Sequence, residues 1–156
     1  MRCLVPFVVG LTVASCSEGS PPPTDAEKIA LVEDANINPL EPVELEPLDD
    51  RDIDHAALPD EHCAFLPGIV DAQPLFVVGS EIGIYKRAGQ VRRVVADGGS
   101  KLVAGDIHAR FGGLEHAVRL AAGSTTTGND VPVRLTLLDG RDRIAFEQHG
   151  TLDCTG

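Results

Sequence analysis

A run of acidic residues, DDRDIDHAALPDE at residues 49–61, contains a spacing that binds calcium in other proteins. Four of its carboxylates stand at positions 1, 3, 5 and 12 of an EF-hand loop, where Ca²⁺ takes oxygen ligands: Asp50, Asp52, Asp54 and Glu61. Position 6, however, is His55, although the EF-hand loop requires glycine there for its turn. Such spacing arises easily by chance in a segment this rich in aspartate. We therefore expect no metal site here, and weak calcium binding is the open alternative.

The histidines are the other candidate metal ligands: His55, His62, His108, His116 and His149. His55 and His62 are seven residues apart, which is wider than the spacing of most zinc-binding histidine pairs. His108 and His116 flank a Gly-Gly turn and could approach each other across a hairpin, but no third ligand stands beside them. We predict that the protein holds no metal and no cofactor, and interpret the histidines as strand and surface residues.

Nucleophilic catalysis has no recognisable motif in this sequence. The stretch GSEIG at residues 79–83 has the glycines of a nucleophile elbow, but its serine stands one place too early. A Ser-x-x-Lys pair and a phosphate-binding glycine loop are also missing from the sequence. We predict that the protein is not an enzyme, and a hydrolase with a dispersed site is the least favoured alternative.

Two features are candidates for binding. Four basic residues gather on one predicted hairpin and form a candidate surface for anionic headgroups, a glycan, an acidic envelope protein or the protein's own acidic segment: Lys86, Arg87, Arg92 and Arg93. Charged side chains of this kind also protect a strand edge from unwanted pairing, which is the alternative interpretation. The second feature is the polar loop AGSTTTGND at residues 122–130, which could carry recognition or simply connect two strands.

The negative charge of the protein is concentrated in one segment. The formal net charge is −11, and residues 17–61 contain fourteen acidic residues against two basic ones. Residues 62–156 contain ten of each. Because nucleic-acid binding depends on neutralising phosphates with basic side chains, we expect no nucleic-acid partner.

The first sixteen residues have the organisation of an export signal. Arg2 precedes an apolar run from Leu4 to Ser15 that is too short to span a bilayer. The end of this run, VASC at residues 13–16, resembles the lipobox of bacterial lipoprotein precursors. The resemblance implies cleavage before Cys16 and a lipid on its sulfur that anchors the protein to a membrane. Ser17 then implies the outer membrane, facing the periplasm, if the cell is Gram-negative.

Ordinary secretory cleavage is the alternative, and the cysteine count argues against it. Cys3 leaves with the signal, and Cys63 can pair with Cys154. Cys16 would then be an odd free thiol in an oxidising compartment, which needs an explanation. Lipidation of Cys16 supplies that explanation.

Composition divides the chain into three parts. Residues 1–15 form the signal peptide, residues 16–61 an acidic and mostly extended tether, and residues 62–156 a folded domain. Within the tether, the capping-box sequence TDAE predicts a short helix over residues 25–35. The alternation of proline, glutamate and aliphatic residues in PLEPVELEPL, residues 39–48, favours extended chain.

The domain is expected to be all-β, a small antiparallel barrel or sandwich of about eight short strands. The predicted strands cover residues 74–79, 81–87, 90–96, 101–105, 107–112, 114–121, 131–138 and 142–148. Apolar alternation is clearest over residues 131–137 and at Ile144 and Phe146, and hairpin turns are signalled by Asp97-Gly98, Asp139-Gly140 and, less clearly, Ala88-Gly89. A disulfide between Cys63 and Cys154 would join the two ends of this domain.

The expected function is that of an envelope lipoprotein whose β domain presents a binding or structural surface. The plan of lipobox, tether and small disulfide-bracketed β domain is similar to that of lipoprotein inhibitors of lysozyme, and HARFGG at residues 108–113 resembles the Ala-Arg-Tyr turn of that family. The match departs from the family at Phe111, which replaces the tyrosine, and at Asp106-Ile107, which replaces Ser-Gly. Inhibition of a cell-wall-degrading enzyme is therefore the alternative function.

Overall fold

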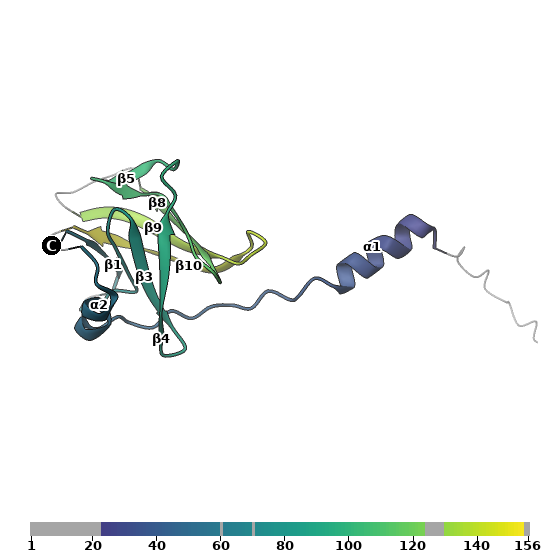
Figure 1. Cartoon of the computed structure of the whole chain (residues 1–156), viewed down its shortest axis with the longest axis horizontal. Helices are drawn as coiled ribbons and strands as arrows, with labels where there is room; N and C mark the ends of the chain where they lie inside the picture. The colour runs from purple at the N-terminus through teal and green to yellow at the C-terminus, as the bar shows by residue number, and fades with distance from the viewer. Residues whose placement is uncertain (1–22, 60, 70, 124–129, 155–156) are drawn as a thin grey trace, which may run out of the picture. The chain divides into compact units, whose positions relative to one another are not determined.

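The computed structural model describes residues 23–59, 61–69, 71–123 and 130–154 (Figure 1). The lipobox and Cys16 lie outside these residues, as does most of the polar loop at residues 122–130. The chain divides into two compact units, the first ending at Asn38 and the second beginning at Pro39. Among the described residues, no helix has the length and apolar character needed to cross a membrane.

The described part of the first unit contains one helix, α1 (Asp25–Ala35), which confirms the helix predicted from its capping box. The Thr24 N–H donates to the Glu27 carboxylate at 2.6 Å, and the Glu27 N–H donates to the Thr24 hydroxyl at 3.3 Å. These bonds satisfy backbone donors that a helix start otherwise leaves unpaired, and they lower the pKa of the Glu27 carboxyl. The helix buries none of its residues.

The second unit is a closed barrel of eight antiparallel strands, so the predicted all-β fold is confirmed and the barrel is its form. The barrel strands are β1 (Cys63–Pro67), β2 (Phe76–Val78), β3 (Ile82–Arg87), β4 (Gln90–Ala96), β7 (Arg110–Gly112), β8 (Ala117–Ala122), β9 (Asp130–Leu138) and β10 (Ile144–Asp153). Each strand pairs with the next one in this order, and β10 pairs with β1 to close the barrel. Closure pairs the two strands that would otherwise be sheet edges open to aggregation.

Side chains fill the interior of the barrel. Phe65, Phe76 and Phe111 are each at most 1% exposed, and the rings of Phe76 and Phe111 meet edge to face with centroids 5.9 Å apart. Gly83 makes room for this packing, because a Cβ there would lie 2.4 Å from the Phe76 ring. The predicted alternation in β9 is confirmed, since Val133, Leu135 and Leu137 are all buried. An eight-stranded barrel is narrow enough for side chains to fill it.

Four sequence expectations about the strands are wrong. The predicted strand over residues 107–112 is divided, with Ile107–His108 in a separate two-stranded sheet and Arg110–Gly112 in the barrel. The strand β1 was not predicted, although its alternate residues are buried. The turn at Asp97-Gly98 does not join paired strands, because β4 pairs with β7 and the intervening residues form a separate sheet of β5 (Leu102–Ala104) and β6 (Ile107–His108). The alternation at Ile144 and Phe146 is interrupted by a register shift, which leaves Ile144 53% exposed.

Two predicted hairpins are confirmed. Ala88-Gly89 joins β3 to β4 with both residues at positive φ, 49° and 70°, as the tightest hairpin turns require. Asp139-Gly140 lies in the turn between β9 and β10, where the Asp139 carboxylate accepts hydrogen bonds from the N–H groups of Arg141 and Arg143, both at 2.9 Å. These bonds lower the pKa of the Asp139 carboxyl.

Both ends of the barrel are covered. At one end, Ile107 of the β5–β6 sheet is 2% exposed and belongs to the core. At the other end, the segment 43–48 crosses the opening, with the Val43 N–H donating to the Ala145 carbonyl at 2.9 Å and the Glu46 N–H donating to the Lys86 carbonyl at 2.9 Å. Val43 is 4% exposed and belongs to the same core.

The segment before residue 62 is thus partly integrated into the barrel, which differs from the expected tether over residues 16–61. Val43 and Leu48 are both buried. The helix that follows them in the chain, α2 (Asp50–Ala56), packs on the outside of the barrel, where Leu48 and Ala56 cover Val77 and Ile84. The composition of the proline- and glutamate-rich stretch did not indicate this packing. Two of its apolar side chains, Val43 and Leu48, are buried, whereas the glutamates between them are not.

The first part of the acidic stretch that has calcium-loop spacing is helical, since α2 covers Asp50–Ala56, whereas Glu61 lies outside the helix. Asp49 is the N-cap of α2, and its side chain accepts the Asp52 N–H at 2.9 Å, while the Asp52 carboxylate accepts the Asp49 N–H at 3.1 Å. A calcium loop must instead wrap around its ion. Of the four carboxylates with calcium-loop spacing, Asp52 is therefore used for helix capping.

Candidate functional site

A buried polar pair lies at the barrel end that the segment 43–48 crosses. Tyr85 on β3 is 1% exposed and His116, just before β8, is 7% exposed, with the Tyr85 hydroxyl oxygen 3.0 Å from Nδ1 of His116. Burial raises the pKa of Tyr85 to about 12, with a contribution from Glu115, and burial together with the Arg87 charge lowers the pKa of His116. A neutral imidazole with its proton on Nε2 can accept a hydrogen bond from the Tyr85 O–H at Nδ1, so both groups can stay neutral.

Glu115 connects two arginines beside this pair. Its carboxylate lies 2.9 Å from the Arg92 guanidinium and 3.6 Å from the Arg87 guanidinium. Nε of Arg92 is buried and has no hydrogen-bond partner among the described residues. Arg87 and Arg92 flank the β3–β4 hairpin, and Glu115 precedes β8, so the ion pairs tie two loops of the barrel together.

The segment between β7 and β8, residues 113–116, is here called the Leu114 loop. Leu114 is 106% exposed, whereas the two residues after it are tied to Arg87, Arg92 and Tyr85. Gly113 allows the tight path, because a Cβ there would lie 2.7 Å from the His116 carbonyl oxygen. A large apolar side chain therefore projects fully into solvent from a loop that is held at the two residues following it.

The four basic residues of the predicted binding surface all have partners within the protein. Lys86 pairs with Asp52 of α2 at 2.7 Å, and the Arg93 guanidinium donates to the Ala56 carbonyl at the end of α2. Arg87 also lies 3.6 Å from Glu41, in addition to its contact with Glu115. The protein's own acidic segment thus contacts Lys86, Arg87 and Arg93, whereas Arg92 pairs with Glu115 of the barrel itself.

The Lys86–Asp52 pair is partly buried, with side chains 21% and 17% exposed. The hydrogen bond between them lowers the pKa of the Asp52 carboxyl and raises the pKa of the Lys86 ammonium group. A cleft of about 440 Å³ opens next to this pair, between α2 and β4, and His55 and Arg93 are among its lining residues. Nδ1 of His55 lies 3.0 Å from the Arg51 carbonyl, within the same helix.

Two further histidines, His62 and His108, have local partners. Nδ1 of His62 lies 3.0 Å from the Pro59 carbonyl, and Nδ1 of His108 lies 3.4 Å from the Ser100 hydroxyl. The two histidines that flank the Gly-Gly turn therefore have different partners, since His116 faces Tyr85. Within the described ranges, no group of three or more His, Cys, Asp or Glu residues is arranged to hold a metal ion.

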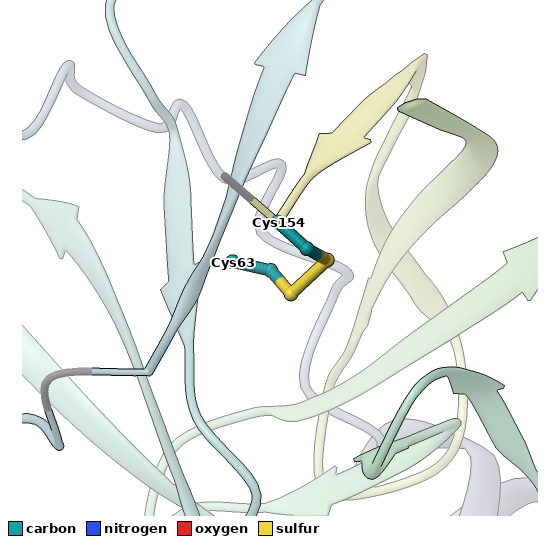
Figure 2. Close-up of a disulfide and its surroundings, with 2 residues drawn as sticks. All are labelled: Cys63 and Cys154. Atoms are coloured by element: carbon teal, nitrogen blue, oxygen red, sulfur yellow. A yellow bond between two sulfur atoms is a disulfide. The ribbon is translucent and has the colours of Figure 1, made fainter. Parts of the chain in front are cut away.

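The disulfide expected from the cysteine count is present. Cys63 begins β1 and Cys154 directly follows β10, and their sulfurs are bonded across 91 residues of chain (Figure 2). The strands that carry them are already paired, with Ala64 opposite Asp153. The disulfide therefore locks the seam at which the first and last strands close the barrel.

A second basic surface was not identified from the sequence. Arg110 on β7 and Arg119 on β8 lie directly opposite each other, and together with Lys101 they line a cleft of about 370 Å³ on the outside of the barrel. These residues are widely spaced along the chain, so only the register of β7 against β8 brings them together. In the sequence, Arg110 stands in the HARFGG stretch with no other basic residue beside it, so no local pattern indicated this surface.

The chain matches no protein-family model, no curated protein and no solved structure. Its function is therefore inferred from the geometry of its own residues.

Proposed function

We propose that this protein is an envelope lipoprotein, anchored by a lipid on Cys16, whose β domain binds another macromolecule through the Leu114 loop without catalysing a reaction. The observation that carries the proposal is the full exposure of Leu114 on a loop whose neighbours are held by Arg87, Arg92 and Tyr85. Apolar anchors on preorganised loops bind well, because little conformational freedom is lost when they enter a pocket on the partner.

The filled barrel also supports binding at the outer surface. Its core is packed with aromatic and aliphatic side chains, and Val43 and Ile107 cover its two ends. A ligand inside would have to displace this packing. The lipid anchor is supported by the lipobox and by the Cys63–Cys154 disulfide, which suits an oxidising compartment and leaves Cys16 without a partner from within the barrel.

Affinity capture tests the binding proposal. The detergent-solubilised full chain serves as bait in envelope extract, beside a Leu114→Glu variant and a control variant, Leu102→Glu, which changes another exposed leucine, 58% exposed, on β5. We expect a saturable partner that the wild type and the Leu102→Glu variant retain and that the Leu114→Glu variant loses. Equal capture by all three would refute a role for the Leu114 loop.

Intact mass of the membrane-extracted protein tests the anchor. We expect a mature chain that begins at Cys16 and carries the added mass of lipid. An unmodified Cys16 would rule out the lipoprotein part of the proposal while leaving the binding part intact.

A second candidate function is inhibition of a cell-wall-degrading enzyme such as lysozyme. The observation that favours it is the position of the Leu114 loop directly after the HARFGG stretch, where a rigid projecting loop could enter an enzyme cleft. Phe111 of that stretch is 1% exposed and belongs to the core, so it is not available as a contact residue. Inhibition of lysozyme by the wild type, and its loss in Leu114→Glu, would select this function.

A further inference from the structure

Two arginines face each other on the outside of the barrel. Arg110 and Arg119 are cross-strand partners, and the residues beside them, Phe111 and Val118, are also partners and point into the core with 1% and 0% exposure. Because side chains alternate across a strand, both guanidinium groups point outward from neighbouring strands. Like charges placed directly opposite each other weaken strand pairing unless something neutralises them.

The surroundings of the pair form a small basic cleft. Its volume is about 370 Å³, within the range of small-molecule sites, and Lys101 adds a third positive charge. The other lining residues are small or apolar, or contribute a hydroxyl: Gly99, Ser100, Ala109, Leu120 and Ala121. No acidic residue is among those that line this cleft in the described part of the chain.

Both arginines also line an adjoining hollow that contains Asp97 and Asp142, but these acids leave most of the positive charge unneutralised. Asp142 reaches Arg119 only at 3.5 Å, and its side chain is 81% exposed, so the ion pair contributes little. The Asp97 carboxylate accepts the Gly99 N–H at 3.0 Å within its own turn. Arg110 and Lys101 have no ion pair among the described residues. The β3–β4 hairpin differs in this respect, because acidic residues cover its basic side chains.

We propose that the cleft between Arg110, Arg119 and Lys101 binds a phosphate group. Arginine presents a planar fork of N–H donors that matches phosphate oxygens, and lysine adds a point charge. A phosphate monoester carries up to two negative charges on three acceptor oxygens, which suits a cleft lined by three cations. Occupation of the cleft would also relieve the repulsion between the two arginines. This site goes beyond the proposed function, since it requires neither the lipid anchor nor the Leu114 loop.

Thermal unfolding of the full chain in inorganic phosphate tests the site. Sodium chloride at matched ionic strength is the reference, so that general screening is subtracted. We expect phosphate to raise the unfolding temperature saturably, and Arg110→Gln or Arg119→Gln to weaken phosphate binding roughly 10- to 100-fold, as the loss of a charge-assisted hydrogen bond predicts. Arg141→Gln, an exposed arginine in the β9–β10 turn outside the cleft, is the matched control and should bind as the wild type does.

A second readout separates loss of binding from loss of folding. Without phosphate, Arg110→Gln should unfold at the same temperature as the wild type or higher, because the substitution removes the like-charge contact with Arg119. A variant that unfolds early even without phosphate would point to a structural role for Arg110 and would overturn the assignment.

A vesicle-binding experiment distinguishes a soluble phosphorylated ligand from a phosphorylated lipid headgroup. Sedimentation with vesicles containing phosphatidic acid, compared with vesicles of neutral lipid, reports on a headgroup as the ligand. Binding of free phosphate that depends on Arg110 supports a soluble phosphorylated ligand, and binding confined to the phosphatidic acid vesicles, again dependent on Arg110, supports a lipid headgroup. Stabilisation that is equal in chloride and phosphate, with no Arg110-dependent vesicle binding, would overturn the proposal.

Discussion

The hydroxyl of Tyr85 and Nδ1 of His116 lie 3.0 Å apart at one covered end of the barrel, although the two residues are 31 positions apart in the chain. The contact joins β3 to the loop that carries Leu114, and the rings meet edge to face with centroids 6.1 Å apart. A buried hydroxyl and a buried imidazole would each be destabilising without a partner. The pair thus fixes the Leu114 loop and makes the barrel end sensitive to pH in both directions.

Tyr85 should ionise at a higher pH than an exposed tyrosine does. Its pKa is raised to about 12 because burial disfavours the charged phenolate, so stability should fall as pH rises from about 10 towards 12. Tyr85 is the single tyrosine of the sequence, which contains no tryptophan, and absorbance near 295 nm therefore reports on this residue alone. A reversible midpoint near 10 in the folded protein would contradict the burial of the phenol.

At acidic pH, His116 should destabilise the fold. Burial lowers its pKa, and nearby charges act in both directions: Arg87, Glu115, Asp139 and Arg92. Above about pH 6.5 the imidazole is neutral in both the folded and unfolded states. As pH falls below that value, the unfolded chain binds the proton more readily, so the free energy of unfolding should decrease.

Urea unfolding between pH 7.5 and 5 measures this effect. His116→Gln keeps a hydrogen-bonding side chain for Tyr85 but does not titrate, and it should show a smaller decrease than the wild type. His149→Gln, which changes an exposed histidine on β10, should show the wild-type decrease. If the His116→Gln variant and the wild type have the same pH dependence, His116 is not responsible.

Removal of the disulfide should destabilise the barrel strongly. The bond between Cys63 and Cys154 spans 91 residues, and the chain-entropy model gives about 4–5 kcal/mol for a loop of that size. Urea unfolding of the double variant Cys63→Ser, Cys154→Ser should show this loss, while Cys16→Ser should unfold as the wild type does. An unchanged free energy of unfolding in the double variant would show that strand pairing alone closes the barrel.

The segment 43–48 should be required for the stability of the barrel. Leu48 is 1% exposed, so Leu48→Ala should lower the free energy of unfolding by about 2–5 kcal/mol. Leu40→Ala is the control, because Leu40 is 39% exposed and its truncation should have little effect. Deletion of residues 17–38 should leave the unfolding transition unchanged, whereas deletion of residues 17–61 should lower its midpoint. If the two deletion variants had the same unfolding midpoint, residues 39–61 would not stabilise the barrel and would act only as a tether.

Local sequence patterns were sufficient for much of the fold. The capping box at Thr24, the Ala88-Gly89 turn and the alternation over Val133, Leu135 and Leu137 each act over a few residues, and each is confirmed. The errors occur where distant residues decide the outcome. The strand β1 forms because β10 and β2 offer it partners on both sides, and residues 97–109 leave the barrel because β4 pairs with β7.

The same distinction between local patterns and long-range contacts applies to the candidate sites. The sequence by itself determined the all-β class, the concentration of acid before the barrel and the pairing of Cys63 with Cys154, because composition and cysteine parity do not depend on register. Only the tertiary structure decided that Asp52 pairs with Lys86 and that Arg110 lies opposite Arg119 on the neighbouring strand. It also decided that Leu114 is exposed to solvent while Glu115 and His116 contact the barrel. Those contacts join residues far apart in the chain, and strand order and register, set by the packing of the whole core, bring them together.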